Sequence, residues 1–234
     1  MKVAESCRDV AQTNIFDKWS ERYGQWFKTP IGKLIKKYEG QLVMGMLSPG
    51  RGEKILDAGC GTGVFTCDML VAGVQIIGLE LSLPMLLEAG NKLQGYPFYM
   101  VRGDMRMLPF HDNAFDKAVS VTAIEFLEDA RGAIRELFRV TKPGGCIVVA
   151  TLNALSPWAT RRRQAGKKGH PIFKQAIFRS PGEIRNLSPV EGIIKTAIHF
   201  QKHDAPDRAI KSEKKGQSQD LNTGAFIAAR WQKP

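Results

Sequence analysis

The chain has 234 residues, of which 43% are hydrophobic and 24% are charged, a composition typical of a globular protein. This length suits one α/β domain with additions. No apolar stretch approaches the ~20 residues of a membrane span, and residues 1–9 contain no apolar signal core. The four cysteines form no C-x-x-C pair, so neither a disulfide framework nor a zinc site is expected. Together these features favour a reduced, cytoplasmic protein.

The net charge of +11 lies mostly in the C-terminal third of the chain. Residues 1–150 contain 18 Lys and Arg against 17 Asp and Glu, whereas residues 151–234 contain 16 against 6. A basic surface of this kind attracts an anionic substrate, a nucleic acid or a membrane surface. It can equally be a solvated surface with no partner.

Helices and strands are predicted from the spacing of apolar residues. The i, i+3/i+4 spacing predicts helices over residues 13–46, divided at Pro30. From there to residue 150, short apolar strands alternate with helices. Strands are expected at 54–57, 75–79, 97–101, 116–121 and 146–150, and helices at 62–72, 83–93 and 129–140. This alternation predicts an α/β fold with a doubly wound, mostly parallel sheet.

The segment after residue 150 is less regular. Residues 157–168 form a basic stretch that we expect to be helical, and the S-x-x-E pattern at Ser180 predicts another short helix. Apolar residues predict strands at 192–200 and 224–231. Residues 202–221 are polar and nearly devoid of large apolar side chains, so a mobile loop is expected to join these two strands.

The most informative motif lies where the first strand ends. Asp57 is followed by Gly59, Gly61 and Gly63, and helical spacing resumes at Val64. A strand, a glycine turn and a helix bring the backbone close to a nucleotide-like ligand, because glycine has no Cβ and permits positive φ. Val64 stands where the dinucleotide fingerprint needs its last glycine. This difference favours S-adenosylmethionine over a nicotinamide cofactor; the alternative is a tight turn in an unrelated α/β protein.

Glu80 is a second acid of interest. It ends the second strand, 17 residues after Gly63. A carboxylate in this place can accept hydrogen bonds from both hydroxyls of a ribose. The alternative is an ordinary surface acid at a strand end.

Five segments of the chain match one family in their order and spacing. They lie at residues 55–66, 78–86, 103–110, 115–116 and 136–145. Through them the chain resembles the class I S-adenosylmethionine-dependent methyltransferases, especially the group that includes ubiquinone and menaquinone biosynthesis enzymes. The resemblance covers about residues 14–155. It implies a seven-stranded sheet in the order 3-2-1-4-5-7-6 with an antiparallel last strand, an N-terminal helical lid and substrate segment over 1–52, and a cofactor-binding domain over 53–234.

The same resemblance implies a site for S-adenosylmethionine at the carboxyl ends of the strands. Asp104 would accept a hydrogen bond from the adenine amino group, and Met105 would pack on the ring. A simple turn acid is the alternative for Asp104. The residues implied for the cofactor are Asp57, Gly59, Cys60, Gly61, Thr62, Gly63, Glu80, Leu81, Asp104, Met105, Thr122 and Tyr23.

The loop after the fourth strand and the N-terminal segment are implied to face the substrate. Glu125 follows the fourth strand and is a candidate general base for a hydroxyl or an amine if burial raises its pKa. The alternative is an ordinary acid at the start of the next helix. Tyr23 and Trp26 lie in the segment that resembles the family's lid, where aromatic rings attract a sulfonium. Ordinary packing on the domain is the alternative for both rings.

The sequence therefore predicts methyl transfer from S-adenosylmethionine to a small-molecule acceptor. No metal is expected, because the four histidines are scattered along the chain. The alternatives are an RNA or protein methyltransferase that uses the basic residues 161–168, and a cofactor-binding relative without catalysis. A nucleic-acid substrate is less favoured, because the loop after the fourth strand contains neither the (N/D)-P-P-(Y/F) motif nor a Pro-Cys pair. Nothing in the sequence indicates an oligomeric state.

Overall fold

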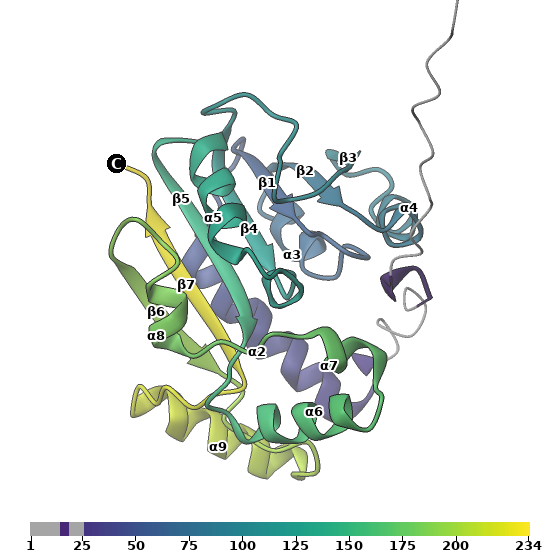
Figure 1. Cartoon of the computed structure of the whole chain (residues 1–234), viewed down its shortest axis with the longest axis vertical. Helices are drawn as coiled ribbons and strands as arrows, with labels where there is room; N and C mark the ends of the chain where they lie inside the picture. Colours follow the sequence, from purple (N-terminus) through teal and green to yellow (C-terminus); the bar gives the residue numbers. More distant parts are fainter. Residues whose placement is uncertain (1–14, 19–25) are drawn as a thin grey trace, which may run out of the picture.

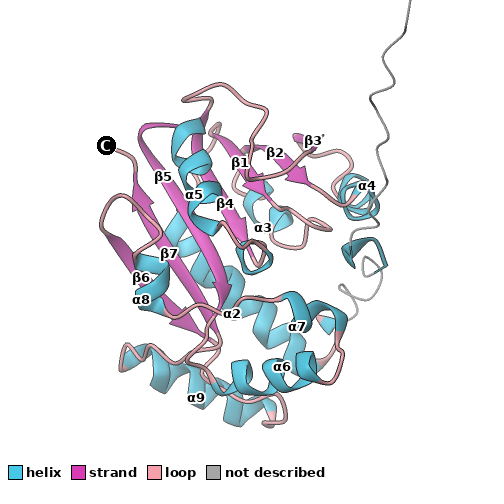
Figure 2. Ribbon diagram, viewed as in Figure 1, coloured by secondary structure: helices cyan, strands magenta, loops and turns pink. Residues whose placement is uncertain are grey.

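The computed structural model describes residues 15–18 and 26–234, and a seven-stranded sheet forms its centre (Figures 1 and 2). The strands are β1 Lys54–Ala58, β2 Gln75–Glu80, β3 Phe98–Arg102, β4 Phe115–Val121, β5 Thr141–Leu152, β6 Gly192–Ala197 and β7 Phe226–Gln232. Their order in the sheet is β3-β2-β1-β4-β5-β7-β6. β1 to β5 pair in parallel, and β7 runs antiparallel to both β5 and β6. The predicted strand order and the antiparallel last strand are confirmed.

Helices precede, connect and follow these strands. They are η1 Ile15–Lys18, α2 Pro30–Leu47, α3 Thr66–Leu70, α4 Leu83–Lys92, η2 Ile124–Phe126, α5 Ala130–Val140, α6 Pro157–Lys167, α7 Pro171–Gln175, α8 Pro181–Arg185 and α9 Pro206–Ser218. Ser82 and Asp129 cap α4 and α5 by accepting backbone N–H groups. Ser180 and Glu183 form the predicted capping box at α8. Among the residues that the structure describes, no helix has both the length and the apolar character needed to cross a membrane.

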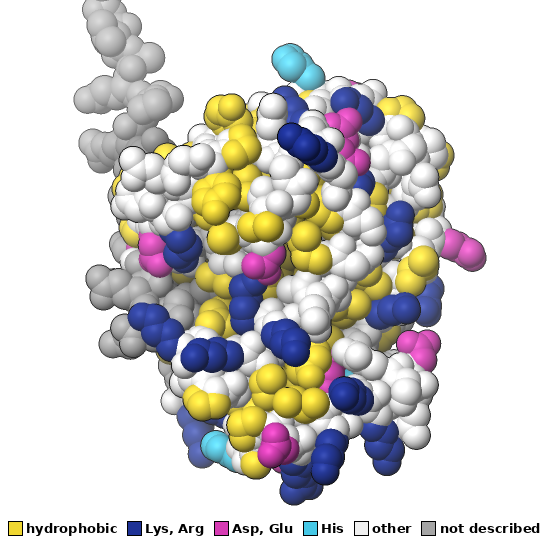
Figure 3. All heavy atoms as spheres, turned by 180° about the vertical axis from the view of Figure 1, so that it is seen from behind, with side chains coloured by type: hydrophobic (Ala, Val, Ile, Leu, Met, Phe, Trp, Pro, Cys, Tyr) yellow, Lys and Arg dark blue, Asp and Glu magenta, His cyan; other side chains and the backbone are white. Residues whose placement is uncertain are grey.

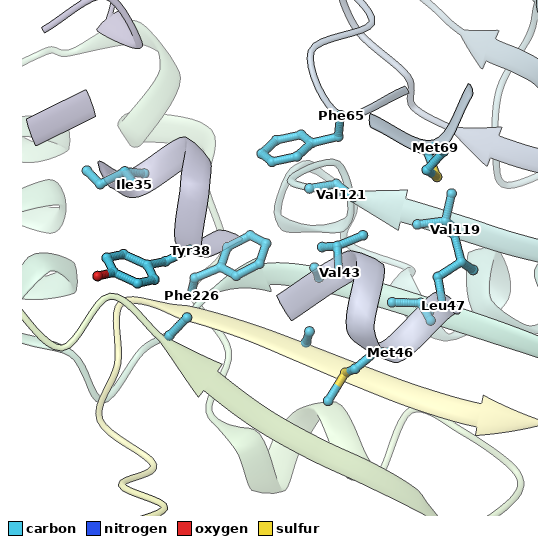
Figure 4. Close-up of a cluster of buried hydrophobic side chains, with 14 of the residues drawn as sticks. Ile35, Tyr38, Val43, Met46, Leu47, Phe65, Met69, Val119, Val121 and Phe226 are labelled. Carbon is cyan, nitrogen blue, oxygen red and sulfur yellow. The ribbon is translucent and has the colours of Figure 1, made fainter. Parts of the chain in front are cut away.

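Two helical layers cover the sheet. Figure 1 shows α2 and α3 behind it and α5 and α8 in front. Because side chains alternate along a strand, Val148 of β5 packs with the α2 cluster, whereas Val149 packs with the α5 cluster. In Figure 4, Tyr38 of α2 lies beside Phe226 at the start of β7. α2, which lies within the predicted segment 1–52, is therefore part of the main hydrophobic core.

The chain that follows β5 covers the edge of the sheet where the parallel strands end. Figure 2 shows α6 and α7 beyond these carboxyl ends. The Trp158 indole N–H of α6 donates a hydrogen bond to the Phe200 carbonyl, 2.6 Å away, and so fastens α6 to the segment after β6. Ligands of doubly wound sheets bind at this edge, which is where the predicted site residues meet.

Three predicted boundaries differ from the structure by three residues or more. β5 begins at Thr141 rather than at residue 146. α3 starts at Thr66 rather than at Thr62, because residues 61–65 form the glycine-rich turn. β6 ends at Ala197 rather than at Phe200. The helix predicted within residues 13–46 is described as η1 and α2, and Tyr23 lies outside the described residues.

The loop predicted over residues 202–221 is wrong, because most of this segment is the helix α9. The inward face of α9 consists of Ala209, Glu213 and Gly216 at helical spacing, so no large apolar residue marks it in the sequence. Glu213 is fully buried, and its carboxylate accepts the backbone N–H groups of Ile198 and His199 at 3.1 and 2.6 Å. One carboxylate thus satisfies two donors just after the end of β6.

Replacing Glu213 with Ala should destabilise the protein by ~1–3 kcal/mol, because two buried N–H groups lose their acceptor. The measurement is the free energy of unfolding in urea. Lys214→Ala is the matched control: Lys214 is exposed on the same helix, and its replacement should change stability by no more than ~0.5 kcal/mol. Equal stability of the two variants would show that α9 contributes nothing through Glu213.

Candidate functional site

The three glycines of the turn after β1 are required for different physical reasons. All have positive φ, with values of 79° at Gly59, 53° at Gly61 and 73° at Gly63. A Cβ at Gly59 would lie 2.5 Å from the Cβ of Ala123, and one at Gly63 would lie 2.9 Å from Cδ1 of Leu93. Among the described residues, a Cβ at Gly61 would come no closer than 4.0 Å to any atom, the sulfur of Met85 being the nearest. Packing requires Gly59 and Gly63, whereas Gly61 leaves its backbone open to a ligand.

Hydrogen bonds fasten this turn to the end of β2. The N–H groups of Gly59 and Cys60 donate to the Leu79 carbonyl at 2.7 and 3.1 Å. The Gly61 N–H donates to Oε2 of Glu80 at 3.1 Å. The Cys60 side chain is buried, which raises the pKa of its thiol well above the ordinary value. Cys60 therefore contributes its backbone to the turn rather than a reactive thiolate.

Glu80 holds the position expected of a ribose-binding acid. Its Oε1 accepts the Ser82 N–H at 2.8 Å, so each carboxylate oxygen already receives one backbone hydrogen bond. A carboxylate has about four acceptor positions, and each oxygen thus keeps capacity for one hydroxyl. Burial raises the pKa of Glu80, and the backbone N–H groups of Ser82, Gly61 and Leu81 oppose that rise. The Glu80 carbonyl accepts the Gly103 N–H at 3.2 Å, which brings the end of β3 alongside.

Asp57 and Thr62 lie in the same turn but differ in their hydrogen bonding. Asp57 is 3% exposed and accepts a hydrogen bond from the Thr66 hydroxyl at 2.6 Å. Burial raises the pKa of Asp57 to about 7. Thr62 is 1% exposed, and its Oγ1 has no hydrogen-bond partner among the described residues. Because a buried hydroxyl without a partner costs ~1–3 kcal/mol, Thr62 points to a polar ligand group at the turn.

The residues predicted for the adenine side gather at the ends of β2 and β3. Leu81 is 48% exposed, whereas Met105 is buried. The Asp104 carboxylate accepts the Arg106 backbone N–H at 2.8 Å and forms an ion pair with the guanidinium of the same residue. The hydrogen bond from the Arg106 side chain lowers the pKa of Asp104. Asp104 is thus an ionised acceptor whose orientation Arg106 holds.

The loop after β4 contacts the glycine turn. Thr122 has a φ of 51°, and its N–H donates to the Ala150 carbonyl at 2.8 Å. The next residue, Ala123, occupies the space where Gly59 lacks a side chain. Two residues later, Glu125 is 1% exposed and accepts a hydrogen bond from the Thr151 hydroxyl at 2.9 Å.

This burial raises the pKa of Glu125 to about 7. The first residue that caps the next helix is Asp129, not Glu125. Glu125 does lie in the first turn of η2, as the alternative from the sequence has it, but its side chain is buried there.

Glu39 of α2 is an acid that the sequence analysis did not single out. It is 6% exposed, and burial raises its pKa to about 8. Glu39 lies four residues after Ile35 and four before Val43, both of which are buried. One acid within an apolar stripe at helical spacing is the signal that would have identified it.

Asp17 of η1 is another residue that the sequence analysis passed over. Its Oδ1 accepts a hydrogen bond from the Ser82 hydroxyl at 2.6 Å. The preceding Phe16 packs edge-on against Phe126, with ring centroids 4.7 Å apart. η1 therefore contacts both the segment after Glu80 and the segment after Glu125. This pairing depends on tertiary structure, so no local pattern could reveal it.

The basic segment and Trp26 of the predicted lid make contacts of their own, and the structure does not describe Tyr23. Arg161 and Arg162 stack over the Trp158 ring, at 4.8 and 5.2 Å from its centroid. Lys202 lies over the Trp26 ring at 5.2 Å, and Tyr23 is outside the described residues. Within residues 15–18 and 26–234, no group of three or more His, Cys, Asp or Glu side chains is arranged to hold a metal ion.

Comparisons with known proteins match the same part of the chain. A family model described as a methyltransferase domain matches residues 56–149. The malonyl-[acyl-carrier protein] O-methyltransferase of Serratia marcescens is 37% identical over 120 residues, which are 51% of this chain and 46% of that protein. The demethylmenaquinone methyltransferase of Corynebacterium kroppenstedtii is 40% identical over 103 residues, 44% of this chain and 43% of that protein. The chain thus spans less than half the length of these relatives.

A solved structure extends the likeness to nearly the whole fold. A S-adenosylmethionine-dependent methyltransferase from Thermotoga maritima superposes with a TM-score of 0.72 at 24% identity, covering 94% of this chain and 98% of that one. At this identity the likeness shows a shared fold. Residues 56–149 thus resemble a methyltransferase domain in sequence, and the likeness over the rest of the chain is one of fold.

Proposed function

We propose that this protein binds S-adenosylmethionine at the glycine turn and transfers its methyl group to a small-molecule acceptor. The observation that carries the proposal is the opening at Gly61 beside the paired acceptor oxygens of Glu80. The buried Thr62 hydroxyl supports it, because this group lacks a partner among the described residues. The matched family and the fold support the same cofactor.

Different residues of the site would bind different parts of the cofactor. Glu80 would accept the two ribose hydroxyls, and Leu81, Asp104 and Met105 would contact the adenine. Gly61 and Thr62, at the other end, would face the methionine part. When bound, the cofactor supplies a methyl group on a sulfonium that leaves readily.

The loop after β4 would form the acceptor side of the site. The protein must align the nucleophile with the methyl group and exclude water, and alignment alone can lower the barrier by several kcal/mol. Thr122 and Glu125 follow the strand that ends beside the turn, and Glu125 would accept the proton of a hydroxyl or amine acceptor. Its burial and its contact with Thr151 support this role, because a carboxyl with a pKa of about 7 is matched to proton transfer at neutral pH.

RNA or protein methylation remains the second candidate. Figure 3 shows Lys and Arg side chains spread over one face of the molecule, without a single basic stripe. Arg161 and Arg162 are half-buried against Trp158, which leaves less charge for a nucleic acid than the sequence suggests. The relatives named above methylate a malonyl group on a carrier protein and demethylmenaquinone, and both names favour a small acceptor group.

Glu80→Gln should weaken the binding of S-adenosylhomocysteine by about 10- to 100-fold, because a charged acceptor of two hydroxyls is lost. Isothermal titration calorimetry measures the dissociation constant. The control is Glu191→Gln, an exposed acid away from the glycine turn, which should not affect binding. Unchanged affinity in Glu80→Gln would refute the ribose role.

Gly61→Ala should prevent cofactor binding while the protein stays folded, because its Cβ meets the ligand rather than the protein. The test is thermal unfolding with and without S-adenosylhomocysteine, which at 100-fold excess over its dissociation constant should add ~2.7 kcal/mol to wild type. Gly52→Ala controls for backbone strain, since Gly52 has a φ of 85° and open space around it. Ligand stabilisation that persists in Gly61→Ala would contradict the proposed opening.

Glu125→Gln should lower kcat about 10²- to 10⁴-fold for any acceptor that transfers a proton with the methyl group. In wild type, kcat should rise with pH through about 7 as Glu125 loses its proton, and the variant should lack this rise. The formation of S-adenosylhomocysteine measures turnover on a panel of amines, phenols and carboxylates. A variant with the wild-type rate and pH profile would exclude Glu125 as the proton acceptor.

A further inference from the structure

The loop that contains Glu125 has backbone carbonyls that its own short helix cannot satisfy. Within η2, the Phe126 and Leu127 N–H groups donate to the Ala123 and Ile124 carbonyls at 3.1 and 3.2 Å. A helix this short leaves the carbonyls at its end without helical donors. Ile124 and Glu125 are buried, and buried carbonyls normally have a donor. The loop therefore needs donors from another part of the chain.

Residues 176–180, which connect α7 to α8, are fixed beside this loop. The Arg179 carbonyl accepts the Ala154 N–H at 3.0 Å, two residues after β5 ends. Phe178 is buried in a small apolar cluster with Leu152, the last residue of β5. Segment 176–180 is thus attached to the carboxyl end of β5 both by its backbone and by a side chain.

This segment supplies donors to three carbonyls of the loop. The Ile177 N–H donates to the Glu125 carbonyl at 2.7 Å. The Arg179 guanidinium donates from Nη1 to the Ile124 carbonyl at 2.9 Å and from Nη2 to the Leu127 carbonyl at 2.7 Å. The three acceptors lie one residue before Glu125, at Glu125 and two residues after it.

An arginine suits this contact because of its shape. The planar guanidinium presents several N–H groups in a rigid fork, so Nη1 and Nη2 of Arg179 bind two carbonyls at the same time. A lysine ammonium is a compact charge without this fork. Arg179 is 8% exposed, so both hydrogen bonds form away from bulk water and are stronger than they would be at the surface.

The side chain of Glu125 is held from the same strand as its backbone. The Thr151 hydroxyl, near the end of β5, donates to Oε2 of Glu125 at 2.9 Å. Segment 176–180 holds the backbone of the loop and is itself attached to β5 through Ala154. Because its backbone and its carboxylate are both fixed relative to β5, Glu125 has few orientations available. Functional side chains need such support to keep a productive geometry.

The Arg179 charge also acts on the Glu125 carboxyl. Burial raises the pKa of Glu125 to about 7, and the Thr151 hydrogen bond and the charges of Arg162 and Arg179 oppose that rise. Glu39 of α2 also interacts electrostatically with Glu125. The positive charge of Arg179 favours the ionised carboxylate, which is the form that accepts a proton.

We propose that Arg179 is a positioning residue for methyl transfer, which holds the loop after β4 so that the Glu125 carboxylate meets the acceptor in one orientation. This inference rests on the proposed function, because Arg179 acts through Glu125, the proposed proton acceptor. Its guanidinium binds backbone carbonyls of the loop, so it influences the reaction without contacting the reacting atoms. A displacement of about 1 Å in such a loop lowers the rate by up to ~10²-fold.

Two variants test the proposal through the kinetic constants. Arg179→Lys keeps the charge and loses the fork, whereas Arg179→Met loses both. For methylation of the panel of amines, phenols and carboxylates, we expect both variants to lower kcat about 10- to 100-fold. The dissociation constant of S-adenosylhomocysteine, measured by calorimetry, should not change. Arg185→Lys and Arg185→Met are the controls, because Arg185 is exposed on α8, and they should keep the wild-type kcat. Wild-type kcat in Arg179→Lys would overturn the proposal.

The pH dependence of kcat separates the charge of Arg179 from its geometry. In wild type, kcat should rise with pH through about 7 as Glu125 loses its proton. The Arg179 charge lowers the pKa of Glu125, so its loss in Arg179→Met should move the rise to higher pH. Arg179→Lys should keep the wild-type midpoint with a lower plateau. A residue with a purely structural role would not move the midpoint, so an unchanged midpoint in Arg179→Met contradicts the proposal.

Hydrogen exchange of the loop needs no acceptor. Wild-type and Arg179→Lys complexes with S-adenosylhomocysteine are compared by mass spectrometry over residues 122–128. The Phe126 and Leu127 N–H groups should exchange at least about 10-fold faster in Arg179→Lys, because local opening becomes easier. The amides of β1 should be unaffected. Equal exchange over 122–128, or faster exchange throughout the sheet, would overturn the positioning role.

These measurements distinguish a failure of this inference from a failure of the proposed function. If S-adenosylhomocysteine does not bind to wild type, or if Glu125→Gln keeps the wild-type rate and pH profile, the proposed function fails at that point. If Glu125→Gln loses activity and Arg179→Lys keeps it, only the inference about Arg179 fails. If Arg179→Met does not fold, Arg179→Lys decides through kcat and exchange; if no acceptor of the panel is methylated, exchange alone decides.

Discussion

The Glu80 carboxylate is the contact on which the organisation of the site depends. It receives one N–H from the glycine turn after β1 and one from the segment that leads into α4. Two loops that leave neighbouring strands are thereby joined through a single side chain. Because both loops are fixed, the backbone opening at Gly61 keeps its shape without a ligand. Such preorganisation lowers the ordering cost of binding.

The parts of the fold that the sequence predicts well have local causes. The doubly wound sheet follows from alternating apolar strands and helices, whereas the strand order was implied by the resemblance to the family. The starts of α4, α5 and α8 follow from capping side chains within three residues. α9 could not be predicted in this way, because its buried face consists of small residues and one acid. Glu213 is stabilised there by two N–H donors of the segment just after β6, Ile198 and His199, which lie 15 and 14 residues earlier in the chain.

The same distinction applies to the site. The cofactor side was predicted because Gly59, Gly61, Gly63 and Glu80 form a motif of fixed spacing whose function depends on backbone geometry. On the acceptor side the predictions were Glu125 and the lid segment with Tyr23 and Trp26, of which Tyr23 lies outside the described residues. Glu39 was overlooked although its place within the apolar stripe of α2 is visible in the sequence; which elements pack around it depends on tertiary structure.

The position of β7 has a consequence for the order of folding. β7 lies between β5 and β6 although it follows both in the chain. When residues 1–225 have left the ribosome, β6 has no strand beside it, and one edge of β5 is unpaired. An exposed strand edge invites pairing with other chains. Because β6 pairs only with β7 in this sheet, the pairing of β6 and of the outer edge of β5 requires residues 226–232.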